Sequence, residues 1–187
     1  GFTGSLDMTN SIFDVYNCDA DEVAVVWVDV EEEVEVDFDN GIGDYCAITD
    51  DAWVSPQGDD NNLGTSELEA LLTIGRALEM VAPNADSPPN INLTEGIFTP
   101  STTGELFPIT MISNVNLIGQ GEEVTILDAD TTNRVITIDN CDNNTISDLT
   151  ITDGATDGDG GGMYLGSSNP ILNNVTISDN SADYGGG

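Results

Sequence analysis

Residues 149–153 (LTITD) return almost unchanged as residues 175–179 (VTISD). Three glycines at 160–162 return in the same way at 185–187. Both pairs indicate a period of about 25 residues, which is typical of solenoids, in which each unit packs only against its neighbours. The stretch from residue 135 to residue 187 therefore decides the fold.

Each repeat unit holds short runs in which apolar and polar residues alternate, separated by Asn, Asp, Ser and Gly. Residues 135–138 (VITI) and 162–165 (GMYL) are one such pair, at nearly the same offset. Runs of this kind predict short strands bounded by turns, and none inside the unit is long enough for a helix. The sequence thus predicts an all-β fold, a parallel β-helix with one coil per ~25 residues.

Residues 1–50 form a separate segment in this interpretation. Positions 33–38 alternate strictly between acidic and apolar side chains, as in a half-buried strand with one solvated face. We expect a small antiparallel β-rich segment, either a unit of its own or the end of an upstream domain. Residues 37–44 (DFDNGIGD) share alternating carboxylates with calcium loops but lack the Glu that closes an EF-hand loop, so they predict a tight turn.

The second predicted domain, residues 51–187, opens with a helix. Ser66 and Glu69 have the spacing of a capping box, and apolar residues follow helical periodicity from there until Pro83. The first coil of a solenoid exposes core and strand edges that another element must cover. Residues 66–82 are therefore predicted to be an N-terminal capping α-helix. The last glycines, 185–187, break off in mid-repeat, which predicts further coils beyond them.

The charge of the chain is strongly negative, with 35 acidic residues against two basic ones and no histidine. Such a surface repels nucleic-acid phosphates and anionic lipid, so neither is expected as a partner. No apolar run reaches the ~18 residues that a membrane span needs, so no membrane insertion is expected. Two interpretations of the acidic residues stay open: solubility in a saline medium, or divalent-cation binding. Arg134 is expected to pair with Asp128 or Asp130.

A candidate metal site lies in the glycine-rich segment between two predicted strands. Asp153, Asp157 and Asp159 carry oxygen ligands of the kind that Ca²⁺ prefers, separated by glycines that let a loop fold around an ion. A solvated loop without metal is the alternative. No cofactor is otherwise required.

The three cysteines give information on the cellular compartment of the protein. Cys18 and Cys46 flank the N-terminal segment and are candidates for a disulfide, which would indicate secretion, while Cys141 falls on a predicted rung.

Asparagines recur before the rung strands, at 143, 144, 173 and 174. They predict an asparagine ladder, with side-chain amides bonded from coil to coil. Asn92, Asn143 and Asn174 also head N-x-Ser/Thr sequons, which leaves glycosylation as the functional alternative.

Together these motifs resemble a known group of proteins. The resemblance rests on residues 54–60 (VSPQGDD), 72–78 (LTIGRAL), 96–101 (GIFTPS), 115–121 (VNLIGQG) and 168–178 (SNPILNNVTIS). This order is similar to the right-handed parallel β-helix proteins of the pectin-lyase-like superfamily, and more narrowly to the large repetitive secreted or surface proteins of bacteria. It implies the fold and an extracellular or cell-surface location, but the same fold carries lyases, hydrolases and adhesins.

The residues favour a protein that is not an enzyme. A lyase of this superfamily would need an Arg or Lys base, yet the chain has no Lys, and its arginines are Arg76, in the predicted helix, and the isolated Arg134. We therefore expect a structural or adhesive extracellular protein that self-associates into rods or filaments, or binds a glycan or another cell-surface ligand. The alternative is a carbohydrate-active module that binds or hydrolyses a glycan, with paired aspartates such as Asp139 and Asp148 as its carboxylates.

Overall fold

The computed structural model describes residues 48–185 of the chain. The chain divides into two compact units, residues 1–46 and 47–187, and the described residues belong to the second. The first 47 residues lie outside the described part, and with them the predicted antiparallel segment, the turn at 37–44 and the Cys18–Cys46 disulfide.

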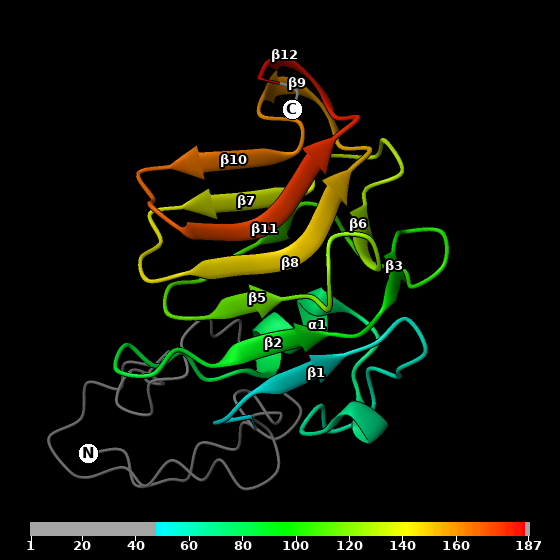
Figure 1. Cartoon of the computed structure of the whole chain (residues 1–187), viewed down its shortest axis with the longest axis vertical. Helices are drawn as coiled ribbons and strands as arrows, with labels where there is room; N and C mark the ends of the chain where they lie inside the picture. Colours follow the sequence, from blue (N-terminus) through cyan, green and yellow to red (C-terminus); the bar gives the residue numbers. More distant parts are fainter. Residues whose placement is uncertain (1–47, 186–187) are drawn as a thin grey trace, which may run out of the picture. The chain divides into compact units, whose positions relative to one another are not determined.

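The described residues are mostly short strands that wind into a β-solenoid of about four turns (Figure 1). Every strand pairing is parallel. This confirms the predicted parallel β-helix. In chain order the strands are β1 (Ala52–Val54), β2 (Asn90–Leu93), β3 (Gly96–Phe98), β4 (Ile109–Thr110), β5 (Asn116–Ile118), β6 (Thr125–Asp128), β7 (Ile136–Asp139), β8 (Thr145–Thr152), β9 (Ala155–Asp159), β10 (Met163–Gly166), β11 (Ile171–Ser178) and β12 (Ser181–Tyr184).

Three faces are built by stacking equivalent strands of successive coils. On the first face, β1, β2, β5, β8 and β11 rise in order, as Figure 1 shows. The later half of β8 also pairs with β6, which pairs with β3, so the long strand turns a corner and contributes to a second face. The third face is β4, β7 and β10, and β9 pairs with β12 beside it.

The register of these strands matches the repeats in the sequence. Leu149 lies beside Val175, the first residues of the two copies of the repeated pentapeptide. Ile136 lies beside Met163, the second residues of the other repeated pair. The repeated residues are therefore neighbours on adjacent coils, as the periodicity predicts.

Apolar side chains at alternate strand positions fill the inside of the coil. Ile91, Leu117 and Ile146 form one fully buried column through β2, β5 and β8. In β11 the equivalent residue, Leu172, is 42% exposed. β11 is the last strand of this face among residues 48–185, so no described strand covers Leu172 on its other side.

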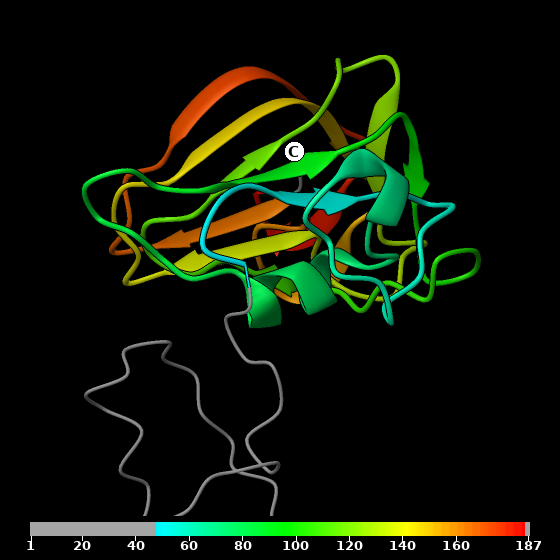
Figure 2. The same ribbon diagram turned by 90° about the horizontal axis from the view of Figure 1, so that it is seen from below.

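The N-terminal edge of the coil is covered by the chain itself. Leu71 forms a parallel bridge with Val54 of β1, donating from its N–H to the carbonyl of Trp53 at 2.9 Å and accepting from Ser55 at 2.9 Å. Helix α1 (Ile74–Met80) lies against β1, β2 and β4 (Figure 2). Its side chains Ile74, Ala77 and Met80 are buried. The predicted capping role is therefore confirmed.

The extent of the predicted helix is wrong. Residues 66–82 form a short 3₁₀ helix, η1 (Glu67–Glu69), and then the seven-residue α1, the one α-helix among residues 48–185. Ser66 makes no side-chain cap. Thr73 is the N-cap instead, and Asp60 accepts hydrogen bonds from the amides of Leu72 and Thr73 just before the first turn of α1.

The corners of the coil explain much of the Asn and Asp content. Asp148 and Asn174, at equivalent positions of β8 and β11, both have a left-handed backbone with φ of 58° and 56°. Asp153 and Asp179, which follow the same two strands, have φ of 51° and 56°. Asn and Asp adopt this conformation more readily than most residues. These positions therefore serve the turns between faces.

None of the helices in residues 48–185 is long and apolar enough to cross a membrane.

Candidate functional site

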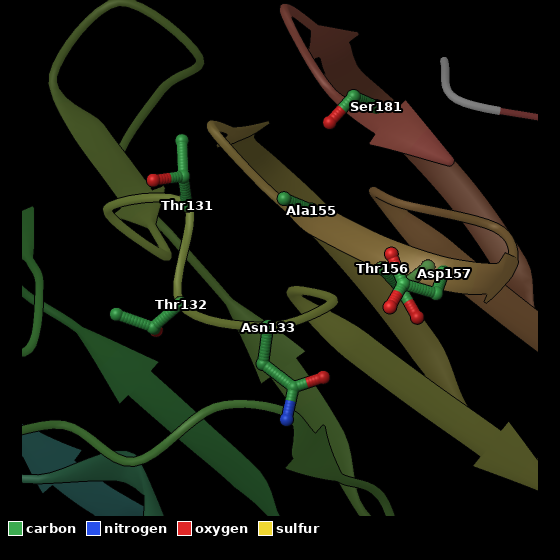
Figure 3. Close-up of a pocket in the computed structure, with 7 residues that line it drawn as sticks. All are labelled: Thr131, Thr132, Asn133, Ala155, Thr156, Asp157 and Ser181. Carbon is green, nitrogen blue, oxygen red and sulfur yellow. The ribbon is translucent and has the colours of Figure 1, made fainter. Parts of the chain in front are cut away.

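A polar pocket of about 420 Å³ opens between a turn and two strands of the coil (Figure 3). The turn supplies Thr131, Thr132 and Asn133, strand β9 supplies Ala155, Thr156 and Asp157, and β12 supplies Ser181.

The turn is held by its own hydrogen bonds. Thr132 donates from both its N–H and its Oγ1 to the carbonyl of Ala129, at 2.9 and 2.7 Å. Thr131 donates from its N–H to the carbonyl of Asp153 at 2.8 Å, and Ala155 donates to the carbonyl of Asn133 at 3.0 Å. The rim is therefore tied to the next coil on both sides.

Thr131 has a φ of 54°, in the left-handed region. A β-branched side chain is an outlier there, and such strain costs about 1–3 kcal/mol and gathers at functional sites. The strained residue borders the pocket, which makes this turn the best candidate for a binding rim.

The far wall is formed by side chains that the coil leaves free to face solvent. Ala155 and Ser181 are partners in the β9–β12 pairing, so they lie side by side on adjacent coils. Asp157 is exposed, and Figure 3 shows its carboxylate close to Thr156 on the β9 side. Asn133 is less free, since its Nδ2 donates to the carbonyl of Phe107 at 3.1 Å and its Oδ1 accepts from Arg134 at 2.8 Å.

This lining has a definite chemical preference. Hydroxyl groups both donate and accept hydrogen bonds, while a carboxylate accepts only. No lining residue carries a positive charge, so an anion would find no counter-charge among them. The pocket suits a neutral ligand rich in hydroxyl groups.

The three aspartates of the predicted calcium site lie in different surroundings. Asp153 is a corner residue, Asp157 lines the pocket, and the main-chain carbonyl of Asp159 accepts hydrogen bonds from Arg134. Among residues 48–185, no three acidic, cysteine or histidine side chains gather closely enough to hold a metal ion. Calcium binding by these aspartates stays a prediction that the arrangement of their side chains does not support.

The predicted ion pair of Arg134 with Asp128 or Asp130 is wrong. Its Nε donates to the carbonyl of Gly160 at 2.8 Å, its Nη1 donates to Thr137 at 3.2 Å, and its guanidinium lies 4.9 Å from the ring centre of Tyr164. Thr137 belongs to Arg134's own coil, and the stacking of β10 on β7 brings Gly160 and Tyr164 of the next coil beside it. Its positive charge thus fastens two coils together through neutral partners.

The asparagine ladder exists, but with other partners than predicted. Asn143 donates from Nδ2 to Oδ1 of Asn114 at 3.2 Å, and Asn116 donates in the same way to Asn90 at 3.0 Å. Asn174 donates to Asp148 at 3.0 Å. Hydrogen bonds from Ser147 and then Asn174 lower the pKa of Asp148 below its ordinary value. The sequon residues Asn143 and Asn174 are exposed, yet their amides are engaged in these bonds.

Asn144 has a different role from its neighbour. It is 2% exposed, and its Nδ2 donates to the carbonyls of Ile112 and Val115, both at 2.7 Å. It therefore holds the turn of the previous coil from inside.

Cys141 is also buried. Its thiol lies 3.2 Å from the carbonyl of Met111 and 3.3 Å from that of Asp139. It fills the inside of a rung.

Two carboxylates at the N-terminus of α1 were missed by the sequence reasoning. Glu105 is 1% exposed and accepts from the amides of Ile74 at 2.7 Å and Gly75 at 3.1 Å. Asp60 accepts from two amides and from the Thr73 hydroxyl at the residues just before. The whole of β2 and β3 separates Glu105 from Ile74 along the chain, and no local signal links the two.

Residues 56–125 are similar to a family described as "Protein of unknown function (DUF1565)", which is known as a pectin-lyase-like β-helix. No curated protein matches the chain. No solved structure matches it either. The chain is therefore a parallel β-helix, and residues 56–125, which form part of its cap and first coils, are similar to this family.

Proposed function

We propose that this protein is a non-enzymatic structural or adhesive component of the extracellular space or cell surface. The observation that carries the proposal is the fastening of each coil to the next, by side chains as well as by main-chain pairing. A scaffold built in this way holds its outer loops at fixed spacing along its length, as adhesive and structural proteins require.

Three kinds of side-chain contact support a stiff scaffold. Amide ladders join Asn90 to Asn116 and Asn114 to Asn143 on successive coils. Arg134 binds the carbonyls of the next coil and packs on Tyr164. Each contact adds to the parallel hydrogen-bond ladder, so bending the coil would break several bonds at once.

The composition supports a place outside the cell, in solvent of appreciable ionic strength. With a net charge of −33 the surface is strongly hydrated, and salt screens the repulsion between its carboxylates.

Self-association belongs to the same proposal. The outer edge of β1 is already occupied by Leu71, so that edge offers no free strand pairing to a second copy. Copies would instead meet through their acidic loops, with Ca²⁺ between carboxylates of neighbouring molecules to offset the repulsion.

Negative-stain imaging of the full natural protein tests this assembly. The protein is imaged in calcium, in magnesium at the same ionic strength, and after chelation. Rods or filaments in calcium that dissociate on chelation are the expected result. Filaments that persist after chelation would support the structural role but contradict a role for calcium in the assembly. Single particles in all conditions would contradict self-association.

The location has its own test. Intact cells of the source organism are treated with an external protease and then probed with an antibody against residues 48–185. Loss of the signal is expected, and full protection of the protein inside intact cells would contradict the proposal.

One observation favours a second candidate, a glycan-binding module. The pocket between the turn at 131–133 and strands β9 and β12 is polar, lacks basic residues in its lining and is bordered by the strained Thr131. Hydroxyl and carboxylate groups in such a pocket match the hydroxyl groups of a neutral sugar.

A glycan array compares the wild type with two variants. Asp157→Ala removes the pocket carboxylate, and Asp183→Ala removes an exposed carboxylate of β12 that does not line the pocket. Binding that is lost in the first variant and kept in the second would support this candidate. No binding by the wild type, or equal binding by both variants, would count against it.

A further inference from the structure

The capping helix is attached to the first coils by a buried carboxylate. Glu105 lies in the loop between β3 and β4, and both of its oxygens bind main-chain amides of α1: Oε2 accepts from Ile74 and Oε1 from Gly75. These are the first two amides of the helix, which have no partner within it. The carboxylate is therefore the direct link between cap and coil.

The loop that carries Glu105 is itself rigid. Thr103 Oγ1 donates to the carbonyl of Thr99 at 2.9 Å and accepts from the amide of Thr99 at 3.2 Å and from that of Glu105 at 3.3 Å. The amide of Thr103 donates to the same Thr99 carbonyl at 3.1 Å. A loop fixed in this way cannot carry Glu105 back to water unless the cap moves.

The charged groups around Glu105 do little to neutralise it. Asp60 approaches the same helix end and repels the carboxylate. Arg76 on α1 directs its guanidinium to Glu79, 3.1 Å away, in the one ion pair among residues 48–185. Helix α1 therefore offers Glu105 its amide dipoles but no salt bridge.

We propose that Glu105 is a proton-sensitive latch between α1 and the first coils, which holds the cap most firmly when the carboxyl group is protonated and opens more often once the proton is lost. The neutral acid keeps one amide hydrogen bond through its carbonyl oxygen and weakens the other, but it escapes both the cost of a buried charge and the repulsion from Asp60. This inference concerns the stability of the cap and is independent of the function proposed above.

The direction of the pH effect follows from linkage. Burial raises the pKa of Glu105 above its ordinary value, against the amides of Ile74 and Gly75, which lower it. When the cap opens, Glu105 meets water and its pKa returns to about 4.3. The closed form thus holds its proton more tightly than the open form. Below about pH 4.3 the latch has its full strength, and strength is lost as the pH rises through the raised pKa of the closed form.

Two measurements on the full chain test the latch. The carboxyl group of Glu105 is titrated by ¹³C NMR in the wild type, where a midpoint above the ordinary glutamate value is expected. Amide hydrogen exchange in α1, corrected for the intrinsic effect of pH, is then followed from pH 4 to pH 8. Protection at Ile74 and Gly75 is expected to fall with rising pH, roughly tenfold for each pKa unit by which burial raises Glu105.

Two variants identify the group responsible. Glu105→Gln keeps the shape of the side chain but cannot titrate, so protection in α1 should no longer change over this pH range. Glu69→Gln removes an exposed carboxylate from the adjacent η1 and should keep the wild-type profile. Parallel profiles for the wild type and Glu105→Gln would overturn the proposal. So would a Glu105 midpoint at or below the ordinary value, and that result does not depend on whether the variant folds.

Discussion

At the scale of single residues, the coil depends on contacts too close to tolerate a side chain. Gly119 follows β5 and lies against the main chain of the next coil, so an added Cβ would collide with the carbonyl oxygen of Asp148. The amide of Gly119 also donates to the carbonyl of Ser147 at 2.8 Å. The glycine is therefore required by the spacing of the coils rather than by its own backbone angles.

Gly119→Ala should destabilise the protein by about 1–3 kcal/mol, because main-chain atoms cannot move aside as a flexible side chain would. The free energy of unfolding from urea titration measures this. Gly75→Ala is the matched control: this helical glycine is exposed, and its Cβ would meet only Glu105 Oε1, at 3.5 Å. The control should be neutral or slightly stabilising, and equal losses in both variants would contradict the argument.

Asp60 fixes the start of the helix. Asp60→Ala removes three hydrogen bonds, to the amides of Leu72 and Thr73 and to the Thr73 hydroxyl, and should cost about 1–2 kcal/mol, as expected for the loss of a helix cap. Thermal unfolding followed by circular dichroism checks the value. Glu67→Ala, an exposed position on η1, should leave the midpoint nearly unchanged.

The residues that close the cap mark the limit of prediction from sequence at this scale. A capping box uses residues three positions apart, and Ser66 with Glu69 has that spacing, yet the helix is capped by Thr73 together with Asp60 and Glu105. Glu105 reaches Ile74 only after the chain has passed through two strands. Such a partner belongs to the tertiary fold, and a single sequence holds no local sign of it.

At the scale of elements, strand positions could be predicted far better than side-chain partners. The spacing of the repeats predicted the register of β8 with β11 and of β7 with β10, because a residue and its repeat occupy the same place on adjacent coils. The predicted ion pair of Arg134 was wrong because of the same stacking of adjacent coils. Its neighbours in space are residues 159–164 of the next coil, and not the aspartates close to it in sequence.

Two isoleucines of the coil differ in burial. Ile146 of β8 is fully buried, and Ile97 of β3 is 47% exposed. Ile146→Ala should cost about 2–5 kcal/mol through lost burial and the cavity left behind. Ile97→Ala should cost clearly less, since part of its surface already meets water. Denaturant titration of both variants tests this, and an Ile97 variant that loses as much as the Ile146 variant would contradict the burial argument.

At the scale of the whole molecule, charge and fold act against each other. The net charge of −33 spreads over a chain with only two basic residues, and the parallel register places some carboxylates at equivalent positions of adjacent coils. Asp153 and Asp179, for example, occupy equivalent corners of adjacent coils. Repulsion of this kind weakens the compact state and is screened by salt.

Stability should therefore rise with ionic strength. Between low salt and molar NaCl, the midpoint of thermal unfolding is expected to increase by about 2–4 °C for each kcal/mol of repulsion that salt removes. If the carboxylates act only through screened repulsion, calcium and magnesium at equal ionic strength should raise the midpoint of the single molecule equally. A larger effect of calcium, lost in Asp157→Asn, would restore the predicted site at Asp153, Asp157 and Asp159.

The closed edge of β1 also sets an order of events during synthesis. The residues that cover this edge, up to Val81, precede β2 to β12 along the chain, so they emerge from the ribosome before the coils that stack on the other edge of β1. Glu105 supplies its hydrogen bonds to the cap only after β2 and β3 have emerged. We therefore expect the cap to be completed during synthesis together with the first coils, and not before them.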